Sequence, residues 1–282
     1  MTKVQSSAAV GSAAQSSAIG AVFDACSAAG RAALMPFITV GYPNLKASGE
    51  LLEALVRGGA DLIEIGVPFS DPLADGATVQ HASQVALEQG TTLDDCFDRA
   101  RAFRARGHTT PLIFMGYSNP FLQYGLDRLA RVAADAGVNG FIVPDLPLEE
   151  SDEFAVPFRA HGLDLIFMVA PTSTAARLRE AAARASGFIY CVSLTGVTGA
   201  RSTMSGGLRE YMARVRAVSS LPLAIGFGIS TPDHVREASS LADGVIVASA
   251  LINHIDSVPA VEQANEAEEF VRSLAAATGK RQ

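Results

Sequence analysis

The chain has 282 residues, of which 49% are hydrophobic and 18% are charged. This length suits one large domain or two small ones, and the low charged fraction indicates a large interior. The formal net charge is −7, which argues against a nucleic-acid-binding protein. The sequence has no run of about 18 apolar residues that could form a transmembrane helix.

Cysteine and lysine positions narrow the chemistry further. Three cysteines are widely spaced and odd in number: Cys26, Cys96 and Cys191. This predicts reduced thiols in a cytoplasmic protein, without a disulfide framework. The three lysines lie outside every apolar run, so none is placed to form a Schiff base at the end of a strand.

The N-terminal residues 1–17 are rich in Ser, Ala and Gly and contain almost no large apolar side chain. Such a segment buries too little surface to offset the entropy lost on ordering, so we expect a disordered tail. The stretch "AIGAVFDACSAA" that follows predicts a short helix. Residues 18–282 are expected to form one domain.

Eight short apolar runs then alternate with segments of helical period. They occupy 33–40, 61–67, 111–117, 140–145, 163–170, 187–194, 221–227 and 243–249. Each run predicts a strand buried on both faces. Two helical stretches, 77–89 and 92–106, follow the second run, and two more follow the last run.

Repeated strand–helix units predict a parallel sheet, and eight strands close a barrel at about 250 residues. The expected fold is therefore an α/β (β/α)8 barrel, or TIM barrel. It should have an N-terminal extra helix and additional short helices after strands two and eight. The alternative is an open doubly wound sheet. Such sheets usually contain a glycine-rich first turn, which "TVGYPN" at 39–44 does not provide.

Two carboxylates in the segment "EIGVPFSDPLADG" are candidates for catalysis. Barrel enzymes place their active sites at the carboxyl ends of the strands. If the face of the strand that includes Glu64 lines the barrel, burial should raise the pKa of Glu64 and suit it to proton donation near neutrality. Asp75 lies at the end of a loop stiffened by Pro68 and Pro72, which would hold it over the pocket.

Both carboxylates also have structural interpretations. Glu64 could be a buried glutamate satisfied by hydrogen bonds, although buried unpaired glutamates are rare. Asp75 could be an ordinary turn aspartate, because Asp-Gly is common turn chemistry. Asp71, in the same loop, is expected to be exposed to solvent.

Glycine-rich turns follow the sixth, seventh and eighth runs: "LTGVTGA", "GFGIS" and "ASALI". Gly196, Gly199, Gly226 and Gly228 permit close approach of the backbone to a ligand. Ser249 could open a short helix whose dipole favours an anion. Barrels often bind phosphate after strands seven and eight, so we predict a phosphoryl ligand.

The five histidines lie in helical or connecting segments: His81, His108, His161, His234 and His254. None follows a strand directly, and no pair has the spacing of metal ligands. No metal site is predicted from them.

Six segments together resemble the tryptophan synthase alpha chain family: "PFITVGYP", "IEIGVPFSDPLADG", "FMGYSNPF", "VPDLPLEES", "GVTGA" and "GFGIS". The segment "GVPFSDPLADG" is highly specific to that family. The resemblance implies a (β/α)8 barrel that cleaves indole-3-glycerol phosphate to indole and D-glyceraldehyde 3-phosphate, with no cofactor of its own.

By motif, the resemblance implies that Glu64 and Asp75 are catalytic, with the catalytic tyrosine Tyr190 beside them. It implies that Tyr117 lines the indole pocket. Thr198 resembles a threonine of a mobile loop that orients the aspartate and closes over the substrate.

The resemblance also implies that Gly199, Gly228 and Ser249 bind the phosphate. The chain departs from some members of the family at two nearby positions. Leu194 occupies the place of a basic residue, and Ala248 occupies the place of the glycine before the phosphate-site serine.

These residue types explain how a carbon–carbon bond could break without a Schiff-base lysine or a metal. An indole ring that takes a proton at C3 becomes an iminium, which accepts the bonding electrons. We expect Glu64 to manage the protons and Asp75 to bind the indole N–H. The alternatives are a metal-dependent sugar-phosphate epimerase or isomerase, with an ion at Glu64, Asp71 and Asp75, and a non-catalytic chain that only activates a partner.

The resemblance further implies an α2β2 heterotetramer with a beta chain that carries pyridoxal phosphate and receives indole. The segment "PFSDP", which includes Asp71, and the expected loop "YSNPF" would face the beta chain. Local packing of these apolar residues is the alternative.

Overall fold

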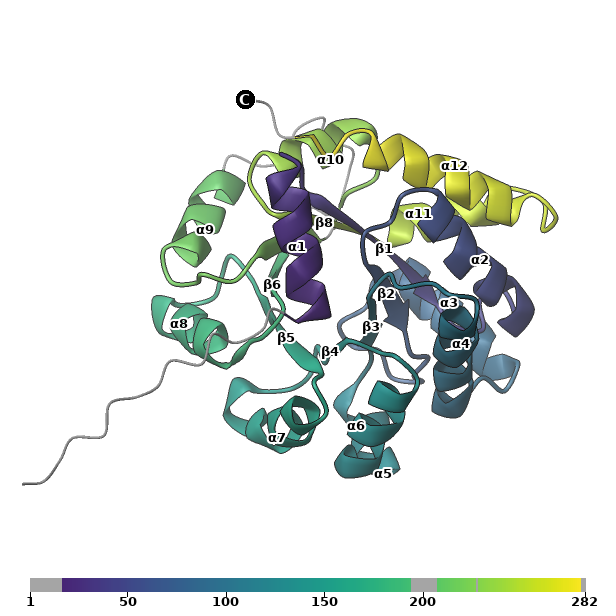
Figure 1. Ribbon diagram of the computed structural model, residues 1–282, viewed down its shortest axis with the longest axis horizontal. Helices are drawn as coiled ribbons and strands as arrows, with labels where there is room; N and C mark the ends of the chain where they lie inside the picture. Colours follow the sequence, from purple (N-terminus) through teal and green to yellow (C-terminus); the bar gives the residue numbers. More distant parts are fainter. Residues whose placement is uncertain (1–16, 194–206, 227, 280–282) are drawn as a thin grey trace, which may run out of the picture.

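The computed structural model describes residues 17–193, 207–226 and 228–279. Eight parallel strands form a closed barrel in chain order, and helices surround it (Figure 1). The predicted (β/α)8 barrel is confirmed, and the open doubly wound sheet is wrong. In these three segments, no helix combines the length and the apolar character that crossing a lipid bilayer requires.

The strands are short, and each lies within one predicted apolar run. They are β1 (Ala33–Thr39), β2 (Ile63–Gly66), β3 (Leu112–Met115), β4 (Gly140–Ile142), β5 (Asp164–Val169), β6 (Ile189–Val192), β7 (Leu223–Gly226) and β8 (Gly244–Val247). The register pairs Phe37 of β1 with Glu64 of β2, and Glu64 with Ile113 of β3. Glu64 therefore lies between two neighbouring strands that are themselves buried.

The helices include the extra ones that the sequence predicted. They are α1 (Ala18–Ala28), α2 (Leu45–Arg57), α3 (Ala77–Glu88), α4 (Leu93–Ala105), α5 (Ser118–Tyr124), α6 (Leu126–Asp135), α7 (Asp152–Ala160), α8 (Ala175–Arg184), α9 (Gly207–Arg216), α10 (Pro232–Ser239), α11 (Ser249–Asp256) and α12 (Gln263–Ala275), with a 3-10 turn at Leu148–Glu150. Helix α1 precedes the barrel, α3 and α4 both follow β2, and α11 and α12 both follow β8.

Helix α5 corrects one expectation, because "YSNPF" is not a loop but contains the start of this helix. Pro120 lies in the first turn, where its missing N–H removes no intrahelical hydrogen bond. The Asp145 carboxylate accepts hydrogen bonds from the Ser118 backbone N–H, at 2.9 Å, and from the Ser118 hydroxyl, at 2.6 Å. The helix is too short to show a helical period in the sequence.

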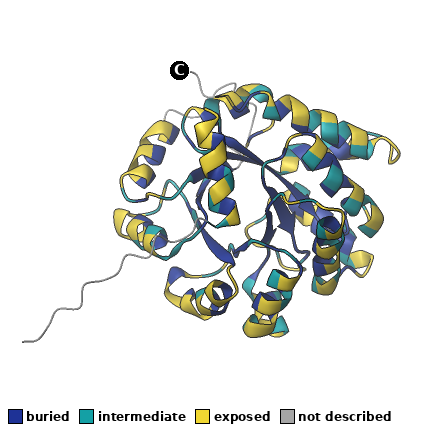
Figure 2. Cartoon of the chain, in the orientation of Figure 1, coloured by how far each residue is buried: buried dark blue, intermediate teal, exposed yellow. Residues whose placement is uncertain are grey.

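Two apolar cores hold the barrel together. The outer core lies between strands and helices, and Figure 2 shows the strands buried while the outward helix faces are exposed. The inner core fills the barrel with side chains such as Leu62 and Ile113, and α1 contributes Phe23 to it. Gly244 makes room for this ring, since a Cβ there would lie 2.8 Å from Phe23.

The expected tail, 1–17, lies outside the described residues except for Ser17. The Ser17 hydroxyl caps α1 by accepting a hydrogen bond from the Gly20 N–H at 3.2 Å. Helix α1 then packs against the inner core (Figure 1). The opposite end of the barrel, where the strands finish, contains the candidate site.

Candidate active site

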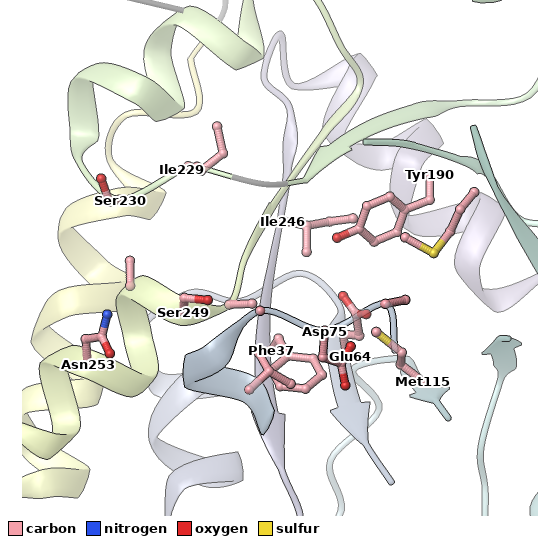
Figure 3. A pocket seen from close by; sticks show the side chains of 17 residues that line it. Phe37, Glu64, Asp75, Met115, Tyr190, Ile229, Ser230, Ile246, Ser249 and Asn253 are labelled. Carbon is pink, nitrogen blue, oxygen red and sulfur yellow. The ribbon is translucent and has the colours of Figure 1, made fainter. Parts of the chain in front are cut away.

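Glu64 is the buried carboxylate of the site. Its side chain extends from β2 into a cavity beside Asp75 (Figure 3), and the residue is only 1% exposed. Neither carboxylate oxygen has a hydrogen-bond partner among the described residues, so Glu64 is not a glutamate satisfied by hydrogen bonds. Burial, with a smaller contribution from the charge of Asp75, raises the pKa of Glu64 to about 8.

Asp75 reaches the same cavity from the loop between β2 and α3 (Figure 3). Hydrogen bonds fix this loop: the Asp75 N–H donates to the Pro72 carbonyl at 3.1 Å, and the Gln80 side chain donates to the Asp75 carbonyl at 2.9 Å. Burial raises the pKa of Asp75 to about 6, although a hydrogen bond from Tyr117 opposes part of this shift. The two carboxyls thus have different proton affinities.

Tyr117 contacts this loop and is not among the residues that line the cavity. Its hydroxyl accepts a hydrogen bond from the Ala74 N–H at 2.9 Å and interacts with the Asp75 carboxylate. Its ring stacks on Phe69 of the same loop, with 5.3 Å between ring centroids. Tyr117 therefore contacts the loop that carries Asp75, whereas the resemblance implied a residue that lines the indole pocket.

Tyr190 extends from β6 into the cavity, and its hydroxyl faces the two carboxyls (Figure 3). Burial, and then the charges of Glu64 and Asp75, raise the pKa of Tyr190 well above its ordinary value. The residue is therefore a neutral hydrogen-bond donor. Gly226 on the adjacent strand makes room for it, because a Cβ at Gly226 would lie 2.2 Å from the Tyr190 hydroxyl.

The cavity between these groups has a volume of about 270 Å³. Apolar side chains form much of its wall: Phe37, Val79, Met115, Met168, Ile229 and Ile246. An apolar cavity with a few converging polar groups is typical of a small-molecule site. The two carboxyls lie at one side, and polar residues after β7 and β8 lie at the other (Figure 3).

The opposite side of the cavity is suited to an anion. Gly228, with φ of +74°, and Ser249, the first residue of α11, both line it, and both are positions at which the sequence predicted a phosphoryl ligand. The helix N-terminus favours negative charge. Ala248 also lines this region, and with φ of −115° its Cβ needs no left-handed backbone.

Other predicted residues lie elsewhere. Asp71 is exposed and accepts a hydrogen bond from the Ser70 hydroxyl at 2.5 Å, so it does not join Glu64 and Asp75. Within the described segments, no three His, Cys, Asp or Glu side chains form a group that could hold a metal ion. The remaining predicted positions lie outside the described residues: Leu194, Gly196, Thr198 and Gly199.

Sequence reasoning missed the apolar wall of the cavity and, among its other residues, Phe37, Ser230 and Asn253. Alternation along β1 could have identified Phe37, which pairs with Glu64 in the adjacent strand. Asn253 lies four positions after Ser249, which places both on one face of α11. Ser230 belongs to "GFGIS", and no sequence feature except its position after a strand pointed to the cavity.

The chain is similar to known proteins in both sequence and architecture. The sequence profile of the tryptophan synthase alpha chain family matches residues 23–281. The tryptophan synthase alpha chain of Roseiflexus sp. (strain RS-1) is 57% identical over 258 residues, covering 92% of this chain and 99% of the relative. That of Geobacter sulfurreducens is 46% identical over 249 residues, covering 88% of this chain and 94% of the relative.

Solved structures agree with this assignment. A Mycobacterium tuberculosis tryptophan synthase structure matches with a TM-score of 0.86 and 38% identity, covering 95% of this chain and 100% of the other. Tryptophan synthase subunit alpha from Legionella pneumophila matches with a TM-score of 0.87 and 36% identity, covering 94% and 99%. With its barrel, its paired carboxyls and these relatives, the chain belongs to the tryptophan synthase alpha chain family.

Proposed function

We propose that Glu64, Asp75 and Tyr190 are the catalytic residues with which this chain cleaves indole-3-glycerol phosphate, the carbon–carbon lyase reaction of its family. The observation that supports this most strongly is the convergence of two carboxyls with different pKa values, about 8 and about 6, on one apolar cavity. Paired carboxyls in unlike environments are typical of paired catalytic roles.

Glu64 acts first as the proton donor. With a pKa of about 8 it is mostly protonated at neutral pH, so it can protonate C3 of the indole ring. The ring then becomes an iminium and accepts the electrons of the carbon–carbon bond as that bond breaks. The glycerol hydroxyl beside the broken bond loses its proton and becomes the aldehyde of glyceraldehyde 3-phosphate. Glu64, now a carboxylate, takes that proton.

Asp75 and Tyr190 stabilise the charges that develop. With a pKa of about 6, Asp75 is mostly ionised at neutral pH and accepts a hydrogen bond from the indole N–H, which becomes positively charged when C3 is protonated. Tyr190 stays neutral and can donate a hydrogen bond beside the two acids. The apolar wall excludes water from the ring and strengthens both interactions.

The phosphate of the substrate binds at the opposite side, at Gly228 and Ser249, with Gly199 expected to contribute and Thr198 expected to orient Asp75. Binding energy from a group remote from the reaction orients the bond to be broken. The position of α11 supports this assignment, because its N-terminus borders the same cavity as the acids.

We also propose that this chain works with a beta chain in an α2β2 heterotetramer, in which the beta chain holds pyridoxal phosphate and receives indole. Leu73 and Leu122, which are 92% and 47% exposed, are apolar residues that directly follow the two segments expected to face it. The cysteines Cys26, Cys96 and Cys191 are buried and unpaired, which supports the proposal of a cytoplasmic protein.

The direct test adds indole-3-glycerol phosphate to the purified protein, with and without a beta chain, and measures released indole. Release that is absent in both arms would contradict the proposal. A chain that only activates its partner is distinguished by Glu64→Gln, which should abolish cleavage while leaving activation of the beta chain intact. Undiminished activity in a chelator argues against the metal-dependent epimerase or isomerase.

A further inference from the structure

Asn253 lies at the anion side of the cavity and has no part in the mechanism above. It projects from α11, one helical turn after Ser249, and lines the cavity together with Ser249 and Ser230 (Figure 3). Residues four positions apart share one face of a helix, so a ligand held at the start of α11 comes within reach of the Asn253 side chain.

The anion side of the cavity lacks basic side chains among the described residues, so neutral hydrogen-bond donors there matter for binding an anion. No lysine, arginine or histidine is found among the described residues that line the cavity. A phosphoryl group held by those residues would therefore depend on hydroxyls, backbone N–H groups, the α11 dipole and side-chain amides. Hydrogen bonds from neutral donors to a charged acceptor are each worth more than neutral pairs.

A hydrogen bond from Thr78 orients the Asn253 side-chain amide. The Thr78 hydroxyl, in the first turn of α3, donates to Asn253 Oδ1 at 3.3 Å. The amide oxygen thus accepts one hydrogen bond, while Nδ2 has no hydrogen-bond partner in the part of the chain that the structure describes. A terminal amide whose oxygen is held in this way presents its N–H groups to a ligand.

A second set of contacts holds α3 and α11 at a fixed separation. The Tyr42 hydroxyl donates to Asp256, the last residue of α11, and the Tyr42 ring packs edge-on against His81 of α3 with 6.0 Å between ring centroids. The hydrogen bond between Thr78 and Asn253 is therefore formed between two helices that are already positioned. Helix α3 begins two residues after Asp75, so the same contacts connect the anion side with the carboxyl side.

We infer that Asn253 is a further substrate-binding residue, whose Nδ2 donates to the phosphoryl group, and that Thr78 is its positioning residue. This inference rests on the proposed cleavage of indole-3-glycerol phosphate and adds a donor to its phosphate site. It predicts that phosphate recognition depends on an amide provided by α11 and oriented by α3.

The test compares full-length variants in the indole-release assay, with inorganic phosphate and indole as inhibitors. N253D keeps the oxygen that accepts from Thr78 but replaces the donor with a negative charge. It should raise KM about tenfold or more, the effect of losing one hydrogen bond to a charged group, while kcat stays within about threefold. Inhibition by inorganic phosphate should weaken by a similar factor, and inhibition by indole should not change.

Thr78 is tested with a matched pair. T78V removes the hydroxyl at nearly constant shape and should raise KM about fivefold, the effect of one neutral hydrogen bond. T78S keeps a hydroxyl and should recover at least half of that loss. N265D makes the same change as N253D at an exposed position of α12 outside the cavity and is the control for added charge.

The outcomes separate this inference from the proposed function. If wild type releases indole but N253D and N253A both keep KM and phosphate inhibition within about twofold, the inference is wrong. It is also wrong if N253D weakens inhibition by indole and inhibition by inorganic phosphate equally, because that pattern indicates a structural role for Asn253. A wild type that neither releases indole nor binds inorganic phosphate overturns the proposed function itself. N253A gives the same readout if the new charge in N253D unfolds α11.

Discussion

Two buried acids, one near each end of the barrel, have different surroundings. Glu64 lies toward the carboxyl ends of the strands, is 1% exposed and faces a cavity, with no partner for either oxygen in the described chain. Asp164 begins β5 at the opposite end, is 6% exposed and interacts with the hydroxyls of Ser17 and Ser186, although its Oδ2 has no hydrogen-bond partner among the described residues. Burial raises the pKa of both carboxyls.

The comparison shows that burial alone does not identify a catalytic acid. Asp164 is surrounded by packed side chains and serine hydroxyls, and Ser17 links it to helix α1. Glu64 instead has an open cavity beside it and a second acid, Asp75, within range of its charge. A functional carboxyl therefore differs from a structural one in its position at the carboxyl end of the barrel and in the cavity beside it. The pKa shift alone does not separate the two.

The largest effect is expected from Glu64→Gln, which keeps the shape and removes the proton donor. The rate constant kcat for indole release should fall about 10²–10⁴-fold, the usual contribution of a general acid, with KM changed little. Asp164→Asn makes the same kind of change at the other end and should leave kcat within about threefold. Equal losses in the two variants would refute the distinction between the ends.

Asp75→Asn should have the next largest effect. It removes the charge that stabilises the protonated indole ring, and we expect kcat to fall about 10²-fold, the size seen when one electrostatic stabiliser is removed. Because the charge of Asp75 also raises the pKa of Glu64, the pKa of Glu64 should fall in this variant. Steady-state kinetics across pH measure both changes. Retention of most of the wild-type kcat would exclude a catalytic role for Asp75.

Tyr117→Phe should have a smaller and pH-dependent effect. The hydrogen bond from Tyr117 lowers the pKa of Asp75, so its loss should raise that pKa above about 6. Less Asp75 is then ionised near pH 6, and the acid limb of the kcat/KM profile should move to higher pH. An unchanged acid limb would indicate that Tyr117 does not act through Asp75.

The smallest expected effect concerns stability. The pKa of Glu64 is about 8 in the folded chain and 4.5 ordinarily, so between these values the folded state keeps a proton that the unfolded state has released. Its contribution to stability is full below the lower value and is lost as pH rises through the higher one, with a slope of at most about 1.4 kcal/mol per pH unit. The free energy of unfolding of Glu64→Gln should therefore increase relative to wild type over this range, as urea titrations at several pH values would show. A constant difference would contradict the raised pKa.

Much of the fold could be predicted from the sequence because apolar runs and helical periods are local signals. All eight strands lie within the predicted runs, and the extra helices after β2 and β8 are present. Helix α5 was missed because seven residues are too few to show a period, and because its start is stabilised by Asp145, which is distant in the sequence.

The candidate site was less predictable where residues depend on neighbouring strands and helices. Strand alternation placed Glu64 correctly in the barrel. The use of Gly226 to admit Tyr190 depends on the register of β6 with β7, which the sequence does not reveal. The bond between Thr78 and Asn253 likewise depends on how α3 packs beside α11.

The most direct test of the central claim is a ¹³C NMR titration of the free protein with labelled glutamate and aspartate carboxyls, assigned with Glu64→Gln and Asp75→Asn. We predict that Glu64 titrates with a pKa of about 8 and Asp75 with a pKa of about 6, so that one is protonated and the other ionised at neutral pH. A Glu64 carboxyl that titrates near its ordinary value of 4.5 would contradict the account.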